Sequence, residues 1–461
     1  MHNAPQDQAL SVNADVAVLF ARFGPYHHAR LKAASAIMRI TAVEFSDIDP
    51  TYAWELVRGE EGFQRVVLFL GASIDTQTSR RIFEAVDKTL DALLPAAVAI
   101  PGWYDRCSIA ALRWCVSHAV PAIIMSETTA WDDQRKTWRE FVKRHMVRLC
   151  SAGLVGGKSH ADYVARLGMA RDRIFLGYDV VDNAYFAAEA AKWRKQNAES
   201  GKQKAPASGQ WSVVSGQKSD VTTQVSVFQN DLRPLTADRC PPPPTPYFLA
   251  SARFVEKKNL PRLIQAYALY RKKSEVRPQK SDLRPPTSDL WSLVLLGDGP
   301  FRPDLCSLIS DLSLQDSVLL PGFKQYNELP AYYAHAGAFV HASTTEQWGL
   351  VVNEAMASGL PVIVSNRCGC AAELVHEGVN GFAFDPYNVE QLAQLMLKIS
   401  AFNFPLSAFG SESQRLISSW GPERFARGLR DACQVAVSAP PPRPNLFDRL
   451  LLRALLMRRT G

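Results

Sequence analysis

Short apolar runs alternate along the chain with longer amphipathic segments. An apolar run without polar alternation is typical of a strand buried on both faces, and helix-length segments between such runs are typical of parallel α/β architecture. In the first half, the predicted strands are residues 16–20, 40–45, 66–70, 96–100, 122–125 and 154–156. The predicted helices between them include residues 79–94, 107–118 and 138–149.

The same alternation restarts near residue 247. Here the predicted strands are residues 247–250, 293–296, 318–320, 338–341, 361–364 and 381–384. Two doubly wound sheets fit this pattern, with residues 1–187 as the first domain and residues 247–420 as the second. Because ligands of such sheets bind at the carboxyl ends of the strands, we expect the two domains to face each other across a cleft. Residues 421–461 are expected to form C-terminal helices that return to the first domain or contact a membrane.

Two polar stretches interrupt the pattern. Residues 188–246 are rich in Lys, Gln, Ser and Pro and end in CPPPPTP, so they are predicted to form a low-complexity insertion or linker. Residues 274–290 form a second polar stretch. The related text QKSDV at Gln217 and QKSDL at Gln279 favours inserted low-complexity sequence over a repeat architecture.

Residues 341–375 carry the densest pattern of candidate chemistry. A predicted buried strand ends at His341, a short polar loop follows, and an apolar helical pattern begins near residues 348–350. Glu346 lies in the loop, and Glu354 lies about one turn inside the helix. Taken alone, Glu346 is explained as a solvated loop acid, and Glu354 as a first-turn acid that complements the helix dipole.

The predicted start of this helix is suited to a phosphate group. The first N–H groups of a helix have no intrahelical partner, and here they lie near Gly349, Leu350 and Val351. The glycine allows close backbone approach, and helix N-termini bind anions. With a phosphate at this turn, the carboxylate of Glu354 would be placed to bind a ribose diol.

Several segments follow an order that is similar to a known family. Glu346 and Glu354 are followed by AMASGLPVI and GVNGFAF, and they are preceded by SARFVEKKNLPRLIQAY, LVLLGDGPFR and PGFKQYNELPAYYAHAGAFVHAS. As a set, these segments cover most of residues 247–399 and resemble the family-4 retaining glycosyltransferases (glycosyl transferases group 1). The resemblance implies an α/β fold of the GT-B type, with two doubly wound Rossmann-like domains facing each other across a cleft.

The resemblance also implies roles for individual residues. Glu346, Arg253 and Lys258 would be the catalytic residues. The donor-binding residues would be Gly24, Gly297, Phe323, Gly349, Leu350, Val351 and Glu354. Arg253 and Lys258 would supply fixed cations to a diphosphate that becomes more negative as the glycosidic bond breaks. Without the other segments, these two cations would be explained as a solvated pair at a strand–helix junction.

The N-terminal half offers fewer signals. The segment LFARFGPYHHARLKAA resembles the family's first loop and helix, with Gly24 where a ligand approaches closely. His27 and Arg30 follow on the helix, where Arg30 could face an anionic group and His27 could equally be solvated. The family often has a histidine after the strand that precedes the cleft, but here AIIMSETTAWDD places Ser126 and Glu127 there. His27, Arg30 and Glu127 are assigned to the acceptor side, and the donor sugar stays open.

Three motifs are rejected as sites. GLVGGKS lacks the first glycine of a phosphate loop, because Ala152 stands there. The acids Asp47 and Asp49 follow the second predicted strand, and GT-B enzymes are generally metal-independent. Cys368 and Cys370 are interpreted as part of a tight turn. No metal site is predicted.

Composition narrows the protein class. The chain has 461 residues, 47% of them apolar and 21% charged, which excludes a chain that is disordered throughout or a coiled coil. The net charge of +7 favours an anionic ligand or membrane face and does not indicate nucleic acid. The eight irregularly spaced cysteines favour a reduced, cytoplasmic protein. No signal peptide is evident, and the longest apolar run is too short to span a bilayer.

The C-terminal tail suggests a location at the membrane. Residues 445–461 mix leucines with four arginines, so this segment could lie on an anionic membrane surface at the inner face. Packing of the segment on the protein, or disorder, would explain the same composition.

We therefore expect a retaining, metal-independent glycosyltransferase. It would move a sugar from a nucleotide-diphosphate sugar, used as co-substrate without a further cofactor, to a lipid-linked or glycan acceptor. The expected pathway is cell-surface polysaccharide or glycolipid biosynthesis. The alternatives are a catalytically silent GT-B protein that binds nucleotide sugars, and a sugar-nucleotide epimerase.

Overall fold

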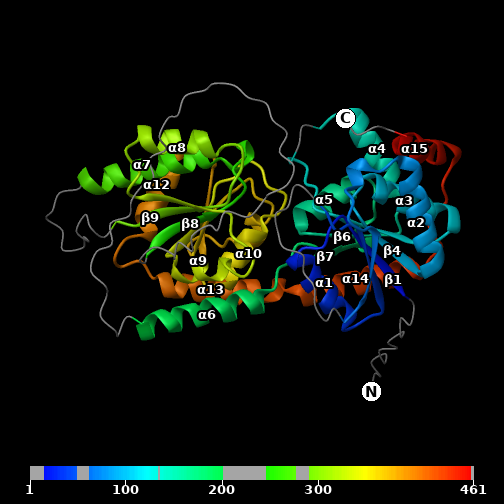
Figure 1. The fold of residues 1–461 in the computed structure, drawn as a ribbon, viewed down its shortest axis with the longest axis horizontal. Helices are drawn as coiled ribbons and strands as arrows, with labels where there is room; N and C mark the ends of the chain where they lie inside the picture. Colours follow the sequence, from blue (N-terminus) through cyan, green and yellow to red (C-terminus); the bar gives the residue numbers. More distant parts are fainter. Residues whose placement is uncertain (1–14, 49–61, 133–134, 201–245, 277–289, 458–461) are drawn as a thin grey trace, which may run out of the picture.

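The structure is a computed structural model that describes residues 15–48, 62–132, 135–200, 246–276 and 290–457. These residues form two lobes, each built around one parallel sheet with helices on both of its faces (Figure 1).

The first lobe contains a seven-stranded parallel sheet in the order β3-β2-β1-β4-β5-β6-β7. Its strands are β1 (Val16–Phe20), β2 (Ile40–Ser46), β3 (Gln64–Phe69), β4 (Ala97–Pro101), β5 (Ala122–Ser126), β6 (Ala152–Val155) and β7 (Ile174–Leu176). The helices of this part of the chain are α1 (Pro25–Ser35), α2 (Ser79–Leu93), α3 (Arg106–His118), α4 (Thr137–Arg148) and α5 (Lys158–Arg166). The strand order reverses between β1 and β4, which is where ligands of such sheets bind.

The second lobe contains a six-stranded parallel sheet in the order β10-β9-β8-β11-β12-β13. Its strands are β8 (Tyr247–Ser251), β9 (Ser292–Leu296), β10 (Val318–Gly322), β11 (Ala338–His341), β12 (Val362–Ser365) and β13 (Gly381–Phe384). The helices are α6 (Asn183–Ser200), α7 (Leu260–Val276), α8 (Arg302–Asp311), α9 (Leu329–His335), α10 (Leu350–Ala357), α11 (Ala371–Leu374), α12 (Val389–Ile399) and α13 (Leu406–Ile417). Here the strand order reverses between β8 and β11.

Each sheet is buried on both faces, which explains the continuous apolar runs in the sequence. Along β1, Ala17 and Leu19 enter one apolar cluster, while Val16, Val18 and Phe20 enter the cluster on the opposite face. The strand β8 divides its residues between two clusters in the same way. Alternation of side chains across a strand therefore fills two core layers in each lobe.

The predicted elements are confirmed, with boundaries that differ by at most two residues. One strand, β7 (Ile174–Leu176), was not predicted from the sequence. It is only three residues long, lies at the edge of its sheet, and is partly exposed. Its apolar signal is weak because Arg171 and Arg173 directly precede it.

One predicted boundary is wrong. The low-complexity insertion was predicted to begin at residue 188, but residues 188–200 belong to helix α6. This helix packs on α9 and α10, Ala190 is buried, and the Arg194 guanidinium donates to the carbonyls of Ala334 and Ser358. Alanine, lysine and glutamate in this stretch are strong helix formers. Residues 201–245 and 277–289, which hold the related QKSD text, lie outside the described residues.

The last helices lie against the first lobe. Helix α14 (Pro422–Val437) packs on α1, β6 and β7, and a Cβ at Gly428 would lie 2.5 Å from the carbonyl oxygen of Leu176. Helix α15 (Leu446–Met457) lies on α3 and α4 (Figure 1). Among the described residues, no helix combines the length and apolarity needed to cross a bilayer.

Candidate active site at the junction of the two lobes

Loops at the carboxyl ends of both sheets contact one another. Tyr26, in the first turn of α1, donates a hydrogen bond to Glu354 on α10. The ring of His160 on α5 lies 3.0 Å from the carbonyl oxygen of Gln347, which precedes α10. The backbone N–H of Lys158 donates to the Glu373 carboxylate on α11. The edges at which both sheets are expected to bind ligands therefore meet.

The central feature of the junction is a carboxylate held by cations. The Glu346 carboxylate, in the loop after β11, forms an ion pair with the Lys258 ammonium, and both side chains are 14% exposed. The same Glu346 oxygen, Oε2, lies 3.4 Å from Nε2 of His341 and accepts a hydrogen bond from the Ser343 hydroxyl at 3.3 Å. The structure therefore brings together the two predicted residues Lys258 and Glu346, which are 88 residues apart in the chain.

The surroundings keep this carboxylate ionised. Burial raises the pKa of Glu346, but Lys258 and His341 outweigh burial and hold the pKa well below its usual range. Burial lowers the pKa of His341, but the neighbouring Cys368 and Glu346 outweigh that effect and raise it to about 9. At neutral pH, Glu346 is therefore a fixed negative charge between two cations and cannot donate a proton.

Lys258 is positioned by a residue that the sequence analysis did not single out. Asn259 adopts a left-handed backbone conformation, with φ of 58°, and its buried amide donates to the carbonyls of Ala342 at 3.0 Å and Pro386 at 2.8 Å. The backbone N–H of Thr344 also donates to the carbonyl of Lys257. These bonds fix the loop after β8 onto the loop after β11. An asparagine directly before Leu260, where α7 begins, is a visible signal for such a turn.

Arg253 lies at the end of β8 with an exposed side chain. Within the described part of the chain, its guanidinium makes no hydrogen bond or ion pair. Gly297, predicted to bind the donor, has φ of 126°, and a Cβ there would lie 1.8 Å from the carbonyl oxygen of Ala252. Gly297 therefore allows the loops after β8 and β9 to pack against each other. It supports the position of Arg253 only through this packing. Phe323, also predicted to bind the donor, is 38% exposed at the end of β10.

The start of α10 has the geometry expected from the sequence. Gly349 is its N-cap residue with φ of 102°, and a Cβ there would lie 2.7 Å from Sγ of Cys368. Only glycine satisfies both conditions without strain. Leu350 and Val351 form the first turn, whose N–H groups have no preceding helical carbonyls. Cys368 and Cys370 are buried with their sulfurs 3.5 Å apart, and Cys368 donates to the carbonyl of Trp348.

Glu354 is fully buried and connects the two lobes. One carboxylate oxygen accepts the hydrogen bond from Tyr26, and the other accepts a hydrogen bond from the Tyr333 hydroxyl on α9 at 2.6 Å. Burial raises the pKa of Glu354 to about 7, although the two tyrosine hydroxyls lower it. The sequence analysis missed both tyrosines. A ribose diol would reach this carboxylate only by displacing the Tyr26 hydroxyl or sharing an oxygen with it.

Two of the three residues assigned to the acceptor side have roles within the fold. Nδ1 of His27 accepts the N–H of Gly24 at 3.1 Å, and burial together with Arg30 lowers the pKa of His27 to about 3. Arg30 is buried, donates to the carbonyl of Val180 and lies 3.9 Å from Asp179. His27 is therefore a neutral helix cap, and Arg30 is a buried cation beside Asp179.

Glu127 does lie at the junction. Burial raises its pKa; Glu346 raises it further, and Arg30 and Lys257 lower it. The carboxyl that stands near the family's usual histidine position thus interacts electrostatically with two residues of the second lobe. Ser126 instead is buried, and its hydroxyl accepts the N–H of Thr128.

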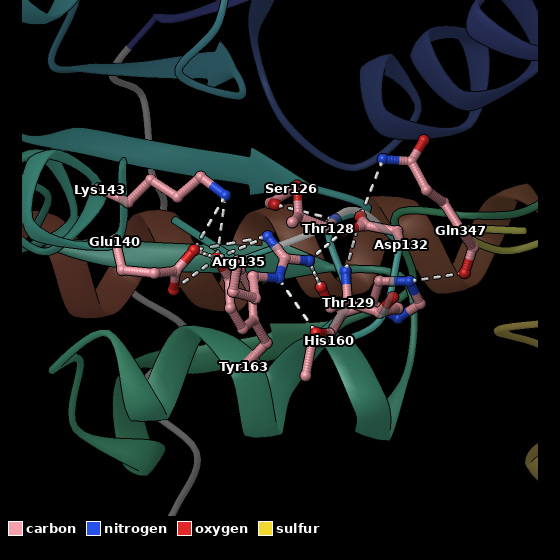
Figure 2. Close-up of polar contacts among 11 residues, drawn as sticks. Ser126, Thr128, Thr129, Asp132, Arg135, Glu140, Lys143, His160, Tyr163 and Gln347 are labelled. Carbon is pink, nitrogen blue, oxygen red and sulfur yellow. Dashed lines mark hydrogen bonds and ion pairs between the residues drawn. The ribbon is translucent and has the colours of Figure 1, made fainter. Parts of the chain in front are cut away.

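The loop that follows Glu127 is anchored by a network of polar contacts, shown in Figure 2. Arg135 donates to the Tyr163 hydroxyl at 3.0 Å and to the carbonyl of Thr129. Asp132 accepts the N–H of Thr129 at 3.0 Å and the side-chain amide of Gln347 at 3.3 Å. Gln347 follows Glu346 directly, so this network fixes the loop after β5 against the loop of the second lobe that holds Glu346.

The metal motif of the sequence analysis is only partly described. Asp47 accepts the N–H of Gly71 at 2.7 Å, and Asp49 lies outside the described residues. Within the described ranges, His, Cys, Asp and Glu side chains do not gather in threes in a way that could hold a metal ion.

Comparison with solved structures defines the fold class. Anabaena Alr3699/HepE in complex with UDP superposes with a TM-score of 0.62 over 90% of this chain and 98% of that chain, at 16% identity. Sucrose-phosphate synthase from Thermosynechococcus elongatus also gives a TM-score of 0.62, over 90% of this chain and 97% of that chain, at 17% identity. The fold is therefore that of the GT-B glycosyltransferases.

Comparison with known sequences gives a family match for part of the chain. Residues 239–406 match the family described as Glycosyl transferases group 1. This part of the chain therefore matches the family that the sequence motifs resemble.

Curated relatives match over shorter stretches. The sulfoquinovosyl transferase SQD2 of Arabidopsis thaliana is 39% identical over 101 residues, which are 21% of this chain and 19% of the plant protein. The alpha-monoglucosyldiacylglycerol synthase of Streptococcus pneumoniae is 44% identical over 75 residues, 16% of this chain and 17% of that protein. The matches thus span less than a fifth of the length of these two relatives.

Proposed function

We propose that the protein is a family-4 retaining glycosyltransferase, which moves a sugar from a nucleotide-diphosphate sugar to an acceptor. The observation that carries this proposal is the ion pair between Lys258 and Glu346 at the junction of the lobes, beside the N-terminus of α10. Nucleotide-bound complexes of HepE, with UDP and with UDP-glucose, support the choice of donor class.

The site can stabilise charge on both sides of the breaking bond. The cations Arg253 and Lys258, with the first N–H groups of α10, would bind the diphosphate and stabilise the negative charge that grows on it. Glu346 would hold the donor sugar, and its negative charge would stabilise the positive charge that develops at the anomeric carbon. Glu354 would bind the ribose hydroxyls.

The acceptor is proposed from the relatives. The streptococcal relative is named as a synthase of a glycolipid, and a mycobacterial relative, 30% identical over 148 residues, is named as a mannosyltransferase acting on a phosphatidylinositol monomannoside. We infer a lipid-linked or glycan acceptor in cell-surface polysaccharide or glycolipid biosynthesis, with the protein on the cytoplasmic side of the membrane.

Two alternative functions can be distinguished from sugar transfer by the products that form from the nucleotide sugar. A silent nucleotide-sugar-binding protein would bind donors without releasing nucleoside diphosphate. An epimerase would interconvert free sugar nucleotides, and the set of Arg253, Lys258, Glu346 and Glu354 favours transfer instead.

The donor class is tested by a thermal-shift screen of nucleotide-diphosphate sugars. A ligand that binds only the folded state raises the melting temperature in proportion to the logarithm of its concentration. We expect at least one donor to stabilise the wild type and to lose that effect in Glu354→Gln. Equal stabilisation of both proteins would remove Glu354 from the donor site.

Glu354 should make donor affinity dependent on pH. Its pKa is raised to about 7, so the carboxylate that accepts ribose hydroxyls becomes fully available only as the pH rises through that value. We expect the donor KM to fall between pH 6 and pH 8, on the order of tenfold per unit of pH below the pKa.

The matched variant is Glu354→Gln, which keeps the shape of the side chain and removes the titration. It should raise the donor KM with little change in kcat, because ribose contacts act equally on ground and transition states. A pH profile of KM that is the same in this variant and in the wild type would contradict the assignment.

We expect transfer to proceed without added metal. The diphosphate charge would be met by Arg253, Lys258 and the N-terminus of α10 instead of a divalent cation. The measurement is the transfer rate in EDTA compared with the rate in Mg²⁺ or Mn²⁺, and the rates should be equal. A requirement for either metal at the chemical step would contradict this prediction.

A further inference from the structure

Helix α15 (Leu446–Met457) carries apolar side chains on two opposite faces. Leu452 and Leu456 are buried against the first lobe, where the helix packs on α3 and α4. On the other side, Leu446 and Met457 are each 74% exposed and Leu450 is 54% exposed. A surface helix normally has one apolar stripe facing the core, so the outer stripe of α15 is in excess of what the fold requires.

The orientation of α15 is fixed by a buried carboxylate. Asp448 is fully buried, forms an ion pair with Arg148 on α4, and lies 2.8 Å from Nδ1 of His145 on the same helix. The backbone N–H of Asn445 also donates to Asp448, and the Asn445 side chain accepts the N–H of Asp448. Because these bonds set the rotation of α15 on α4, the outer apolar stripe is a fixed feature of the surface.

Helix α4 extends this apolar surface. Trp138 and Phe141 on α4 and Phe447 on α15 are each about half exposed, and the rings of Phe141 and Phe447 lie 5.8 Å apart at their centroids. Figure 1 shows the two helices side by side on the first lobe. We call this the α4–α15 surface, and its exposed apolar residues are Trp138, Phe141, Leu446, Phe447, Leu450 and Met457.

The α4–α15 surface is also strongly positive. Its exposed cations include Lys136, Arg144, Arg443, Arg449 and Arg453. The two acids on the helices are both paired inside the protein, Glu140 with Lys143 and Asp448 with Arg148. Neither acid therefore offsets the charge of these five exposed cations.

We propose that the α4–α15 surface docks the protein on an anionic phospholipid bilayer. Exposed aromatic and aliphatic side chains can enter the boundary between headgroups and acyl chains, while arginines at the same level pair with lipid phosphates. The charge of the surface is complementary to an acidic leaflet. A nucleic acid would use the cations but would leave the outer stripe of Leu446, Leu450 and Met457 in water, so it fits less well. The inference does not depend on the proposed transfer reaction.

The test is co-sedimentation of the full chain with vesicles of phosphatidylcholine, with and without phosphatidylglycerol. We expect binding to the anionic vesicles and little to the neutral ones. Arg449→Gln with Arg453→Gln should weaken binding about 25-fold, from about fivefold per arginine. Leu446→Ser with Leu450→Ser should weaken it about tenfold or more. All four side chains are exposed, so these variants should fold like the wild type.

Matched controls lie on the second lobe. Lys192→Gln with Arg415→Gln removes two exposed charges from α6 and α13, and Phe402→Ser removes a side chain that is 83% exposed. These variants should bind vesicles like the wild type. All variants should keep the wild-type rate of donor turnover measured without lipid, which separates this proposal from the proposed function.

Three results would overturn the proposal. They are equal binding to neutral and anionic vesicles, unchanged binding in both α4–α15 variants, and loss of binding in the controls to the same extent. Sedimentation of the wild type with a DNA duplex but not with anionic vesicles would also overturn it, in favour of a nucleic-acid surface.

Discussion

Replacing Lys258 by alanine is expected to lower the kcat of sugar transfer by about two to three orders of magnitude. The ammonium would face the diphosphate, whose charge grows in the transition state, so its loss acts on kcat more than on KM. The structure adds a second reason, because removal of Lys258 leaves the buried Glu346 carboxylate without its closest cation. Arg253→Ala should lower kcat by about two orders of magnitude, because it removes another cation that would face the diphosphate.

The measurement is steady-state kinetics of nucleoside diphosphate release by folded variants. Lys272→Ala is a suitable control, because this lysine is exposed on α7, the helix that follows Lys258. It should retain the wild-type kcat. A kcat of Lys258→Ala within a few fold of the wild type would remove Lys258 from the catalytic residues.

Glu346→Gln should lower kcat by about two orders of magnitude while the protein stays folded. The variant keeps the shape of the side chain but removes a negative charge that Lys258 and His341 hold ionised. We do not assign Glu346 as a nucleophile, since its role here is to hold the donor sugar and stabilise positive charge. The control is Glu412→Gln on α13, which neutralises an exposed carboxylate paired with Arg415 and should leave kcat unchanged.

The two variants should not be additive. Lys258 and Glu346 form one ion pair, so the double variant Lys258→Ala, Glu346→Gln should lose less than the product of the two single effects. Full activity in the double variant would show that the chemistry lies elsewhere in the protein.

The fold was readable from the sequence because its strands are buried on both faces. Runs such as residues 16–20 and 338–341 have no polar alternation, and they match strands β1 and β11 residue for residue. Prediction failed where burial is partial or where helix propensity outweighed a polar composition. The short edge strand β7 and the second half of α6 are the two cases.

The site could be predicted from the sequence where its residues lie close together in the chain. The spacing of Glu346, Gly349 and Glu354 fixes one loop and one helix start, and the structure has both. The partners of these residues could not be inferred in the same way. Tyr26 lies 328 residues before Glu354, and no local pattern links the two.

Assignments based on residue type alone were the weakest. His27 and Arg30 resemble ligand-binding residues in the sequence. In the structure, His27 accepts a hydrogen bond at the N-terminus of α1, and Arg30 lies beside the buried Asp179. Asn259 carried a turn signal, yet its role depends on carbonyls of two loops far along the chain. Such roles follow from tertiary contacts that spacing does not encode.

The most direct test of the central claim is release of nucleoside diphosphate from a panel of nucleotide sugars, with a lipid and glycan extract as acceptor. The wild type is predicted to turn over at least one donor, and Lys258→Ala is predicted to do so at least about a hundredfold more slowly. Absence of release from every donor in the panel, or equal release by the wild type and Lys258→Ala, would contradict the claim that this junction transfers a sugar.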